Sequence, residues 1–330
     1  MNSNCDSTRL KHQLFGLHSQ GVNEKVLVRL NRLIKLDPKD SQRYFAKGMS
    51  LDLIGKKKEA LACLDKAIRI NPKYSDAYYN KGKLLLEMER FEKAIDCCNK
   101  ALLLNPNLKF ARSIKGDALK QIGRFEEAID CFNEAIRLDP SSLASHCLKG
   151  SVLRKMGKKE EAVACYDKAI SIDPNIATVF FNKAFPLVEL EKNEEAVDCL
   201  NKAISLDPNK AEFYINKGYV LNKMRKYEEA LGCCDKAISL DPKKTSVYLN
   251  KGIALSRMER YKEAIECYDT CLRLKPDYAD AYYEKGNALR AVGDQNEAVE
   301  CYEKVIVLNP NHQDALKCKE IVNKLKENNL

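Results

Sequence analysis

Residues 75–108 read SDAYYNKGKLLLEMERFEKAIDCCNKALLLNPNL, and close variants of this stretch follow one another along most of the 330-residue chain. Nine of the ten prolines mark the period, each standing 34 residues after the one before: Pro38, Pro72, Pro106, Pro140, Pro174, Pro208, Pro242, Pro276 and Pro310. A fixed period of this length indicates one small structural unit stacked on itself many times. We number the positions of the repeat from residue 41, which places these prolines at position 32.

Small and large residues recur at fixed positions of the repeat. Position 8 is glycine in seven of eight units and Ala184 in the other, position 20 is always alanine, and position 11 is always leucine. Positions 8 and 11 lie on one face of a first helix, and positions 20, 24 and 27 lie on one face of a second. Small residues at positions 8 and 20 allow the two helices to pack closely as an antiparallel pair, and the proline ends the second helix. The sequence therefore predicts an all-α fold.

This pattern resembles the tetratricopeptide repeat family in its glycine, alanine and proline positions and in the aromatic residue that is common at position 4. The resemblance implies a right-handed α–α superhelix of helix-turn-helix repeats with terminal capping helices. It covers residues 41–312 as eight units. Residues 1–40 are predicted to hold an N-terminal segment and a degenerate first repeat. Residues 313–330 are predicted to form a C-terminal capping helix, so that the chain is expected to be a complete array.

The predicted capping helix is amphipathic. Four apolar residues are expected to face inward, while its lysines face outward: Leu316, Ile321, Val322 and Leu325.

Position 7 departs from the family, because lysine replaces the usual leucine in all eight units, as at Lys81 and Lys251. Its neighbours on the helix are mainly apolar, so each lysine stem is expected to pack while the ammonium group reaches the surface. A functional row of positive charges is the alternative.

The composition is that of a folded, mildly basic chain. Lysine and arginine number 56 against 47 acidic residues, a net charge of +9, which does not by itself indicate nucleic acid. No stretch approaches the roughly 18 consecutive apolar residues of a membrane span, and no signal peptide is evident. A cytoplasmic protein without membrane association is expected.

The 14 cysteines are the main candidates for chemistry, and eight of them share position 23: Cys63, Cys97, Cys131, Cys165, Cys199, Cys233, Cys267 and Cys301. Equivalent positions on stacked helices are about 8–10 Å apart, beyond the roughly 7 Å limit for a disulfide. Packing as small hydrophobic residues is favoured, and a metal or redox site is the alternative. With only four histidines, and neither a phosphate loop nor a nucleophile elbow, no catalytic residue, metal or cofactor is predicted.

In the resembling family, positions 2, 5, 6, 9, 12 and 13 face a concave groove that binds partners. Position 6 carries a row of asparagines whose amides can pair with a peptide backbone or can serve the fold alone: Asn80, Asn182, Asn216 and Asn250. Positions 5 and 9 add an apolar strip on what is expected to be a free surface: Phe181, Phe185, Ile215, Tyr219, Leu249 and Ile253. Together with Tyr79 and Tyr283, these residues are the predicted partner-binding site.

Chaperone-binding relatives grip a C-terminal carboxylate with lysine at position 5 and asparagine at position 9. Position 5 of the eight units is instead aromatic, apolar or small, as at Phe45 and Ser113. The degenerate first repeat has Lys11 at position 5 but Phe15 at position 9, so a chaperone partner of that kind is not expected.

The predicted function is that of a scaffold or adaptor that holds an extended peptide or a helix of a partner protein. One alternative is a regulatory or substrate-recruiting subunit of a separate enzyme, similar to sugar-transferase relatives with an asparagine-lined superhelix. Another is an RNA binder that uses basic residues at the turns between helices, such as Arg124, Lys192 and Arg260. Adjacent glutamates partly cancel those charges, so nucleic acid is not the expected partner.

Pro186 is the one proline away from position 32. It falls inside a predicted first helix, where it cannot donate a backbone hydrogen bond to the carbonyl of Asn182. A kink that re-aims Phe181 and Phe185 toward a ligand is one hypothesis, and tolerated drift in a single unit is the other.

Overall fold

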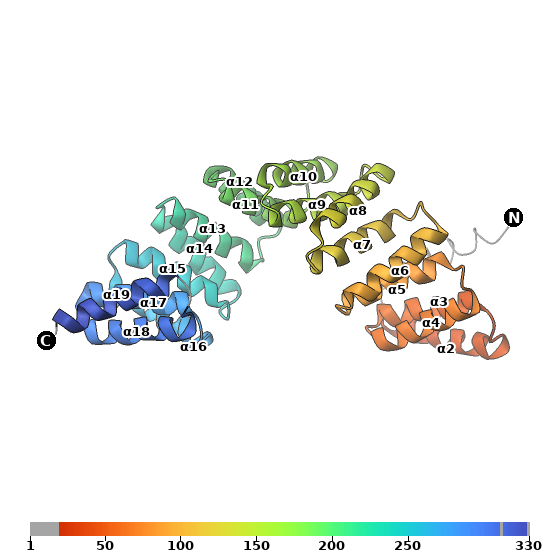
Figure 1. The fold of residues 1–330 in the computed structure, drawn as a ribbon, viewed down its shortest axis with the longest axis horizontal. Coiled ribbons are helices and arrows are strands. Elements are labelled where there is room, and N and C mark those ends of the chain that lie inside the picture. Colours follow the sequence, from red (N-terminus) through yellow and green to blue (C-terminus); the bar gives the residue numbers. More distant parts are fainter. Residues whose placement is uncertain (1–19, 311–312, 329–330) are drawn as a thin grey trace. The chain divides into compact units, whose positions relative to one another are not determined.

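The computed structural model describes residues 20–310 and 313–328, and every regular element in these two ranges is an α-helix (Figure 1). The chain divides into two compact units, Met1–Ile172 and Asp173–Leu330. The all-α repeat fold predicted from the sequence is confirmed. None of the described helices is long and apolar enough to cross a membrane.

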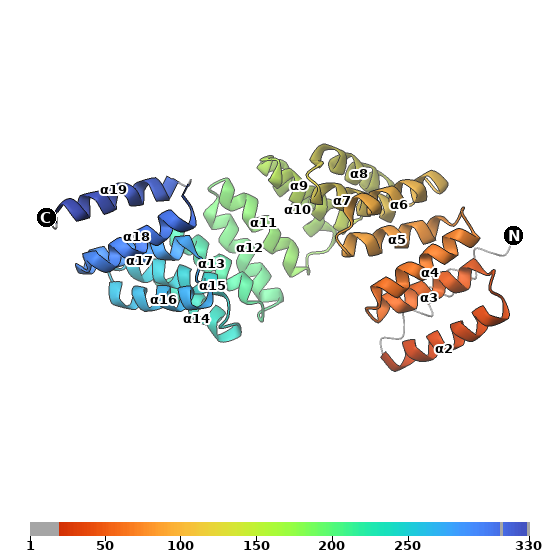
Figure 2. The same ribbon diagram turned by 60° about the horizontal axis from the view of Figure 1, so that its bottom comes forward.

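Each repeat forms one pair of helices, and the first unit contains these: α2 (Gln20–Leu36), α3 (Ser41–Leu53), α4 (Lys57–Ile70), α5 (Ser75–Glu87), α6 (Phe91–Leu104), α7 (Lys109–Gln121), α8 (Phe125–Leu138), α9 (Leu143–Lys155) and α10 (Lys159–Ile172). Helices α3 and α4 lie side by side, as do α5 and α6 (Figure 1 and Figure 2). Within this unit, the second helix of each pair also contacts the first helix of the next pair, as α4 contacts α5, so the pairs stack.

The second unit repeats this arrangement with the following helices: α11 (Ala177–Glu189), α12 (Asn193–Leu206), α13 (Ala211–Lys223), α14 (Tyr227–Leu240), α15 (Thr245–Arg257), α16 (Tyr261–Leu274), α17 (Ala279–Val292), α18 (Gln295–Leu308) and α19 (Gln313–Asn328). Helix α11 continues through Pro186 and is as long as α13 and α15. The kink proposed at this proline stays a prediction.

The two helices of a pair approach most closely at the glycine of position 8. The alanines of position 20 are fully buried, and a Cβ atom added at Gly150 would lie 3.3 Å from the carbonyl oxygen of Ala162. This contact matches the predicted approach of positions 8 and 20. The role of position 24 was not predicted from the sequence. Its side chain lies directly over the glycine, and a Cβ atom at Gly252 would lie 2.4 Å from the Tyr268 ring.

The closeness of this contact varies among the repeats, from 2.4 Å at Gly252 to 3.3 Å at Gly218. The Tyr268 ring is fully buried and leaves no space for a methyl group at Gly252. Cys234 is smaller, and a Cβ atom at Gly218 would lie 3.3 Å from its Sγ atom, a contact that a small shift can relieve.

We predict that Gly252→Ala lowers the free energy of unfolding by about 1–3 kcal/mol, because overpacking displaces the tyrosine. Gly218→Ala is the matched control and should stay within about 1 kcal/mol of the native protein, since alanine is the better helix former. Thermal and urea unfolding of both variants measure the difference. Equal losses in the two variants would contradict this account of position 24.

The turn between paired helices has the same geometry in all eight repeats. Its position-15 residue adopts the left-handed conformation, as Gly55, Gly123, Gly157 and Gly293 in four repeats and as Glu89, Glu191, Arg225 and Glu259 in the others. At Glu259, φ is 59°, and the next amide, of Arg260, donates to the carbonyl of Leu255 at 2.9 Å. These bonds cap the first helix. A residue with a side chain adopts this conformation at a cost of about 1–2 kcal/mol.

Glu259→Gly should therefore raise the free energy of unfolding by about 0.5–1 kcal/mol, because glycine adopts the left-handed conformation without steric cost but loses more entropy on folding. Gly123→Ala, at the same position in another repeat, should lower it. Urea unfolding of the two single variants tests the pair. A loss of stability in Glu259→Gly would overturn the prediction.

Lysines at position 7 lie with their stems against the helix pair and their ammonium groups at its surface. Lys81, Lys251 and Lys285 have side chains that are 18–28% exposed. Each pairs with an aspartate on the second helix of the preceding repeat, and the Lys251–Asp235 distance is 2.7 Å. This geometry confirms the predicted packing of the lysine stem.

The C-terminal helix α19 packs on α18, but one of its predicted inward residues was wrong. Leu316 is 58% exposed, whereas Cys318 and Val322 are buried and Ile321 is half-buried. Residues 318 and 322 are four apart and share a helix face, and residue 316 projects from another face. The side chain of Leu325 lies outside the described part of the chain, as do residues 1–19 of the predicted N-terminal segment.

Candidate functional site

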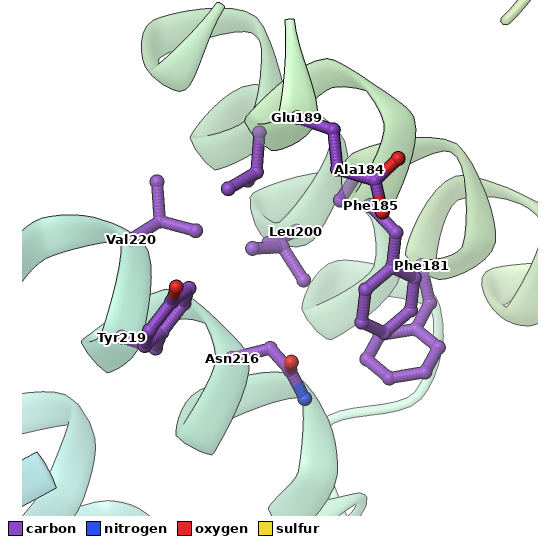
Figure 3. A pocket seen from close by; sticks show the side chains of 9 residues that line it. Phe181, Ala184, Phe185, Glu189, Leu200, Asn216, Tyr219 and Val220 are labelled. Atoms are coloured by element: carbon purple, nitrogen blue, oxygen red, sulfur yellow. The ribbon is translucent and has the colours of Figure 1, made fainter. Parts of the chain in front are cut away.

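The second unit contains a small cavity of about 180 Å³ between α11, α12 and α13. Phe181 and Phe185 on α11 face Asn216, Tyr219 and Val220 on α13 (Figure 3). Leu200 of α12 lies between these two groups. Ala184, Val188 and Glu189 complete the lining.

Aromatic contacts hold one wall of this cavity in place. The rings of Phe181 and Phe185 meet edge to face, with centroids 5.0 Å apart and planes inclined by 82°. Phe181 also contacts Phe213, which is buried, at 5.0 Å between centroids. Phe181 is thus fixed from two sides, and Phe185 is held beside the cavity by Phe181.

The cavity occurs in the repeat that departs from the pattern at position 8. Ala184 replaces glycine there, and position 24 is Leu200, which is 1% exposed. Leucine fills less of the space between two helices than Tyr268 and Tyr302 fill in later repeats, although the cysteine at position 24 of two other repeats is smaller still. Alanine at position 8 together with leucine at position 24 is found in this repeat alone among the eight.

A larger cavity of about 570 Å³ follows between α13, α15 and α17. It is lined by apolar, amide and acidic side chains: Ile215, Asn216, Tyr219, Ser246, Leu249, Asn250, Ile253, Tyr278, Asp280, Tyr283 and Glu284. Asn216 and Tyr219 line both cavities. Tyr219 is 46% exposed, which makes it the most accessible large aromatic residue of this surface.

Nine of the twelve predicted partner-binding residues line these two cavities. That they bind a partner stays a prediction. The first cavity is lined by four of them: Phe181, Phe185, Asn216 and Tyr219. The second is lined by Asn216 and Tyr219 again and by five more: Ile215, Leu249, Asn250, Ile253 and Tyr283. Asn182 lines neither cavity, and Tyr79 and Asn80 belong to the other compact unit.

The expectation that the apolar strip is a free surface was wrong for two of its residues, Ile215 and Leu249. Ile215 and Leu249 are only 7% and 8% exposed, because successive first helices pack against each other there. Ile215 shares a hydrophobic cluster with Val247, and Leu249 shares one with Ala281. These two residues therefore support the fold and show only an edge to the second cavity.

The asparagine row is partly engaged within the protein. The side-chain amides of Asn80 and Asn216 each donate to the carbonyl four residues earlier in the same helix, Asp76 and Glu212, at 2.8 Å. Asn250 is 7% exposed and donates to the carbonyl of Ile215 on the neighbouring first helix at 3.2 Å. One amide hydrogen and the carbonyl of each remain for other contacts.

Asn250→Ala should lower the free energy of unfolding by about 1 kcal/mol or more, because it removes a buried hydrogen bond between α15 and α13. Asn216→Ala should cost less than about 0.5 kcal/mol, since the bond it removes is local to one helix and half-exposed. Comparison of both variants by urea unfolding separates the two roles. If Asn216→Ala is the more damaging change, the assignment is reversed.

Two acidic residues of the second cavity were missed from the sequence. Asp280 and Glu284 occupy positions 2 and 6 of the last repeat. Both positions belong to the groove-facing set, so a search for charge at those positions could have found them. Leu200 carried no such signal, because it comes from a second helix.

The cysteines at position 23 are half-buried or buried, and no disulfide joins the cysteines of the described chain. Burial raises the pKa of the Cys97 and Cys131 thiols, while Lys81 and Lys115 act in the opposite direction. The pKa of Cys301 is raised to about 11, again mainly by burial. A thiol with a raised pKa is a poor nucleophile at neutral pH. Within residues 20–310 and 313–328, no group of three or more His, Cys, Asp or Glu side chains could hold a metal ion.

Basic residues at the turns form ion pairs with acids three residues later. Arg124 lies 2.6 Å from Glu127, Arg260 lies 2.6 Å from Glu263, and Lys192 lies 3.2 Å from Glu195. These side chains are about half exposed, so the pairs add little stability. They do reduce the net positive charge along this edge.

Family models match most of the chain. A model described as a tetratricopeptide repeat matches residues 75–108, 144–176, 211–244, 246–278 and 279–312, and a second, described as a TPR repeat, matches residues 54–89, 116–157 and 187–225. No match was found among curated protein sequences.

Several solved structures are similar. A structure of the APC/C hetero-tetramer Cut9–Hcn1 has a TM-score of 0.61 at 16% identity, over 87% of this chain and 56% of that one. Pseudomonas aeruginosa pilF has a TM-score of 0.55 at 24% identity, over 64% of this chain and 96% of that one. YrrB, described as a TPR protein with an unusual peptide-binding site, has a TM-score of 0.47 at 26% identity, over 58% of this chain and 99% of that one. The first two likenesses show the fold.

Proposed function

Because this chain belongs to the tetratricopeptide repeat family, whose members are in general protein-interaction scaffolds, we propose that it is an adaptor that binds a partner segment along the two cavities of its second unit. The bound segment is an extended peptide or a short helix. The proposal includes no catalytic step. It places the protein in the cytoplasm, where free cysteines stay reduced.

The observation that carries the proposal is the accessible aromatic surface around Tyr219. This ring is 46% exposed and separates two cavities, and Phe185 and Ile253 are lining residues on either side of it. Aromatic side chains beside cavities are the usual anchors of protein interfaces. Half-buried Tyr283 continues this surface toward the last repeat.

Two other functions are supported less well. In a substrate-recruiting subunit that resembles the sugar-transferase relatives, the asparagine amides would hold the ligand backbone, yet Asn80, Asn216 and Asn250 each use one donor inside the protein. An RNA binder would use the basic turns, yet Arg124 and Arg260 lie in ion pairs with glutamates. The adaptor is therefore the function we propose.

Affinity purification of the full chain, with mass spectrometry before and after nuclease treatment, tests the class of partner. An adaptor should retain the same proteins after nuclease. Recovery that depends on nucleic acid would favour the RNA binder, and consistent recovery of one enzyme would favour the recruiting subunit.

Tyr219→Ala should weaken the purified partner's affinity roughly tenfold, because exposed interface tyrosines commonly contribute more than about 1 kcal/mol. The free energy of unfolding should change by no more than about 1 kcal/mol, since nearly half of the side chain is exposed. Val307→Ala is the control: Val307 is 75% exposed and lines neither cavity. Isothermal titration calorimetry measures both affinities. Unchanged affinity in Tyr219→Ala would remove this surface from the interface.

A further inference from the structure

The charged residues that line the two cavities are all acidic. Glu189 lines the first cavity, and Asp280 and Glu284 line the second. Lys223 and Arg257, which are basic residues of α13 and α15, line neither, and the Nζ atom of Lys223 lies 5.9 Å from the centre of the Tyr219 ring. A ligand that follows the apolar surface past Tyr219 therefore reaches a negatively charged end in the last repeat.

Glu284 breaks the asparagine row. Position 6 is asparagine at residues 182, 216 and 250, and the next repeat has Glu284. An asparagine both donates and accepts hydrogen bonds, whereas an ionised glutamate only accepts them. The change therefore replaces a group suited to a neutral peptide backbone with one suited to a cationic donor.

Asp280 adds a second carboxylate to the same cavity. An acid in the first turn of a helix is favoured by the helix dipole, but position 2 is acidic in only three of the eight repeats, so the fold does not require one. The nearest earlier repeat with an acid at position 2 has Glu212, whose carboxylate lies 2.6 Å from the Nζ atom of Lys244. Asp280 is exposed and forms no ion pair with a residue of the described chain.

The aromatic residues beside these acids suit a planar cation. Tyr278 and Tyr283 line the same cavity, and Nζ of Lys275 already lies 4.7 Å from the centre of the Tyr278 ring. A guanidinium group can stack on a tyrosine ring while it donates two hydrogen bonds to a carboxylate. An ammonium group has no such planar, two-pronged geometry.

We infer that the partner segment carries an arginine that binds Asp280 and Glu284 at the far end of the second cavity, together with a large apolar side chain that fills the first cavity. The inference rests on the proposed function, because it names the chemistry of the segment that the adaptor binds. Asp280 and Tyr283 select arginine, and Phe185 and Tyr219 select the apolar residue.

An array of synthetic peptides tests this preference. Each peptide has one phenylalanine or leucine and, at varied spacing, one arginine, glutamine or glutamate, with glycine and serine elsewhere. The full-length protein should bind the best arginine peptide roughly tenfold more tightly than its glutamine form, which corresponds to one charge-assisted hydrogen-bonded contact. The glutamate form should bind more weakly still. Fluorescence anisotropy in low and high salt gives the affinities, and the advantage of arginine should shrink as salt rises.

Charge-neutralising variants locate the contact. Asp280→Asn with Glu284→Gln should lower the affinity for the arginine peptide about tenfold, to that of the glutamine peptide, and should leave binding of the glutamine peptide unchanged. Glu228→Gln with Glu229→Gln is the matched control, because it removes the same charge from exposed positions of α14 in the same unit. This control should bind both peptides as the native protein does.

Any of five outcomes would overturn the inference. If glutamine and arginine peptides bind alike, or if both double variants lose affinity equally, the acidic end does not select the partner, although the proposed function stands. If no peptide binds, or if Tyr219→Ala leaves peptide binding unchanged, the proposed function fails as well. If the free protein self-associates in sedimentation and Tyr219→Ala abolishes that association, the occupant is a second copy of the chain.

Discussion

The close approach of two helices at a residue without a side chain is the contact on which the rest of each repeat depends. Where position 8 is glycine, the second helix can place a tyrosine, phenylalanine, leucine or cysteine directly over the backbone of the first. This contact sets the distance between the paired helices, and the stacking of the next pair depends on that distance. The same contact decides which residues of a first helix are left to face outward.

Much of this architecture could be predicted from the period and the identities of the recurring residues. Glycine and alanine at positions 8 and 20, with proline at position 32, predicted paired antiparallel helices correctly. The left-handed conformation of Glu89 and Glu259 could not be predicted, because glutamate seldom adopts it. Its steric strain is offset by backbone hydrogen bonds elsewhere in the turn. The inward face of the last helix was partly wrong, because Leu316 and Cys318 are close in sequence but project in different directions.

The candidate site, like the fold, was predicted only in part from the sequence. Positions 5, 6 and 9 correctly gave most residues that line the two cavities, but not their degree of exposure. Burial of Ile215 and Asn250 depends on how closely α13 and α15 approach, which a one-dimensional pattern does not contain. The first cavity also depends on Leu200, a residue of a second helix, at the one repeat where alanine replaces glycine. Local exceptions to a regular pattern often accompany functional surfaces.

Tyr219 and Asn216 belong to both cavities, so the two cavities have a common wall. A ligand that moves the Tyr219 side chain out of either cavity therefore changes the wall of the other as well. Any effect that occupation of one cavity has on the affinity of the other is matched, in free energy, by the reverse effect. Two fragments of one ligand, each bound alone, need not then have binding free energies that sum to that of the intact ligand. The unit of recognition on this surface is accordingly the pair of adjacent repeats that share α13, and not the single repeat.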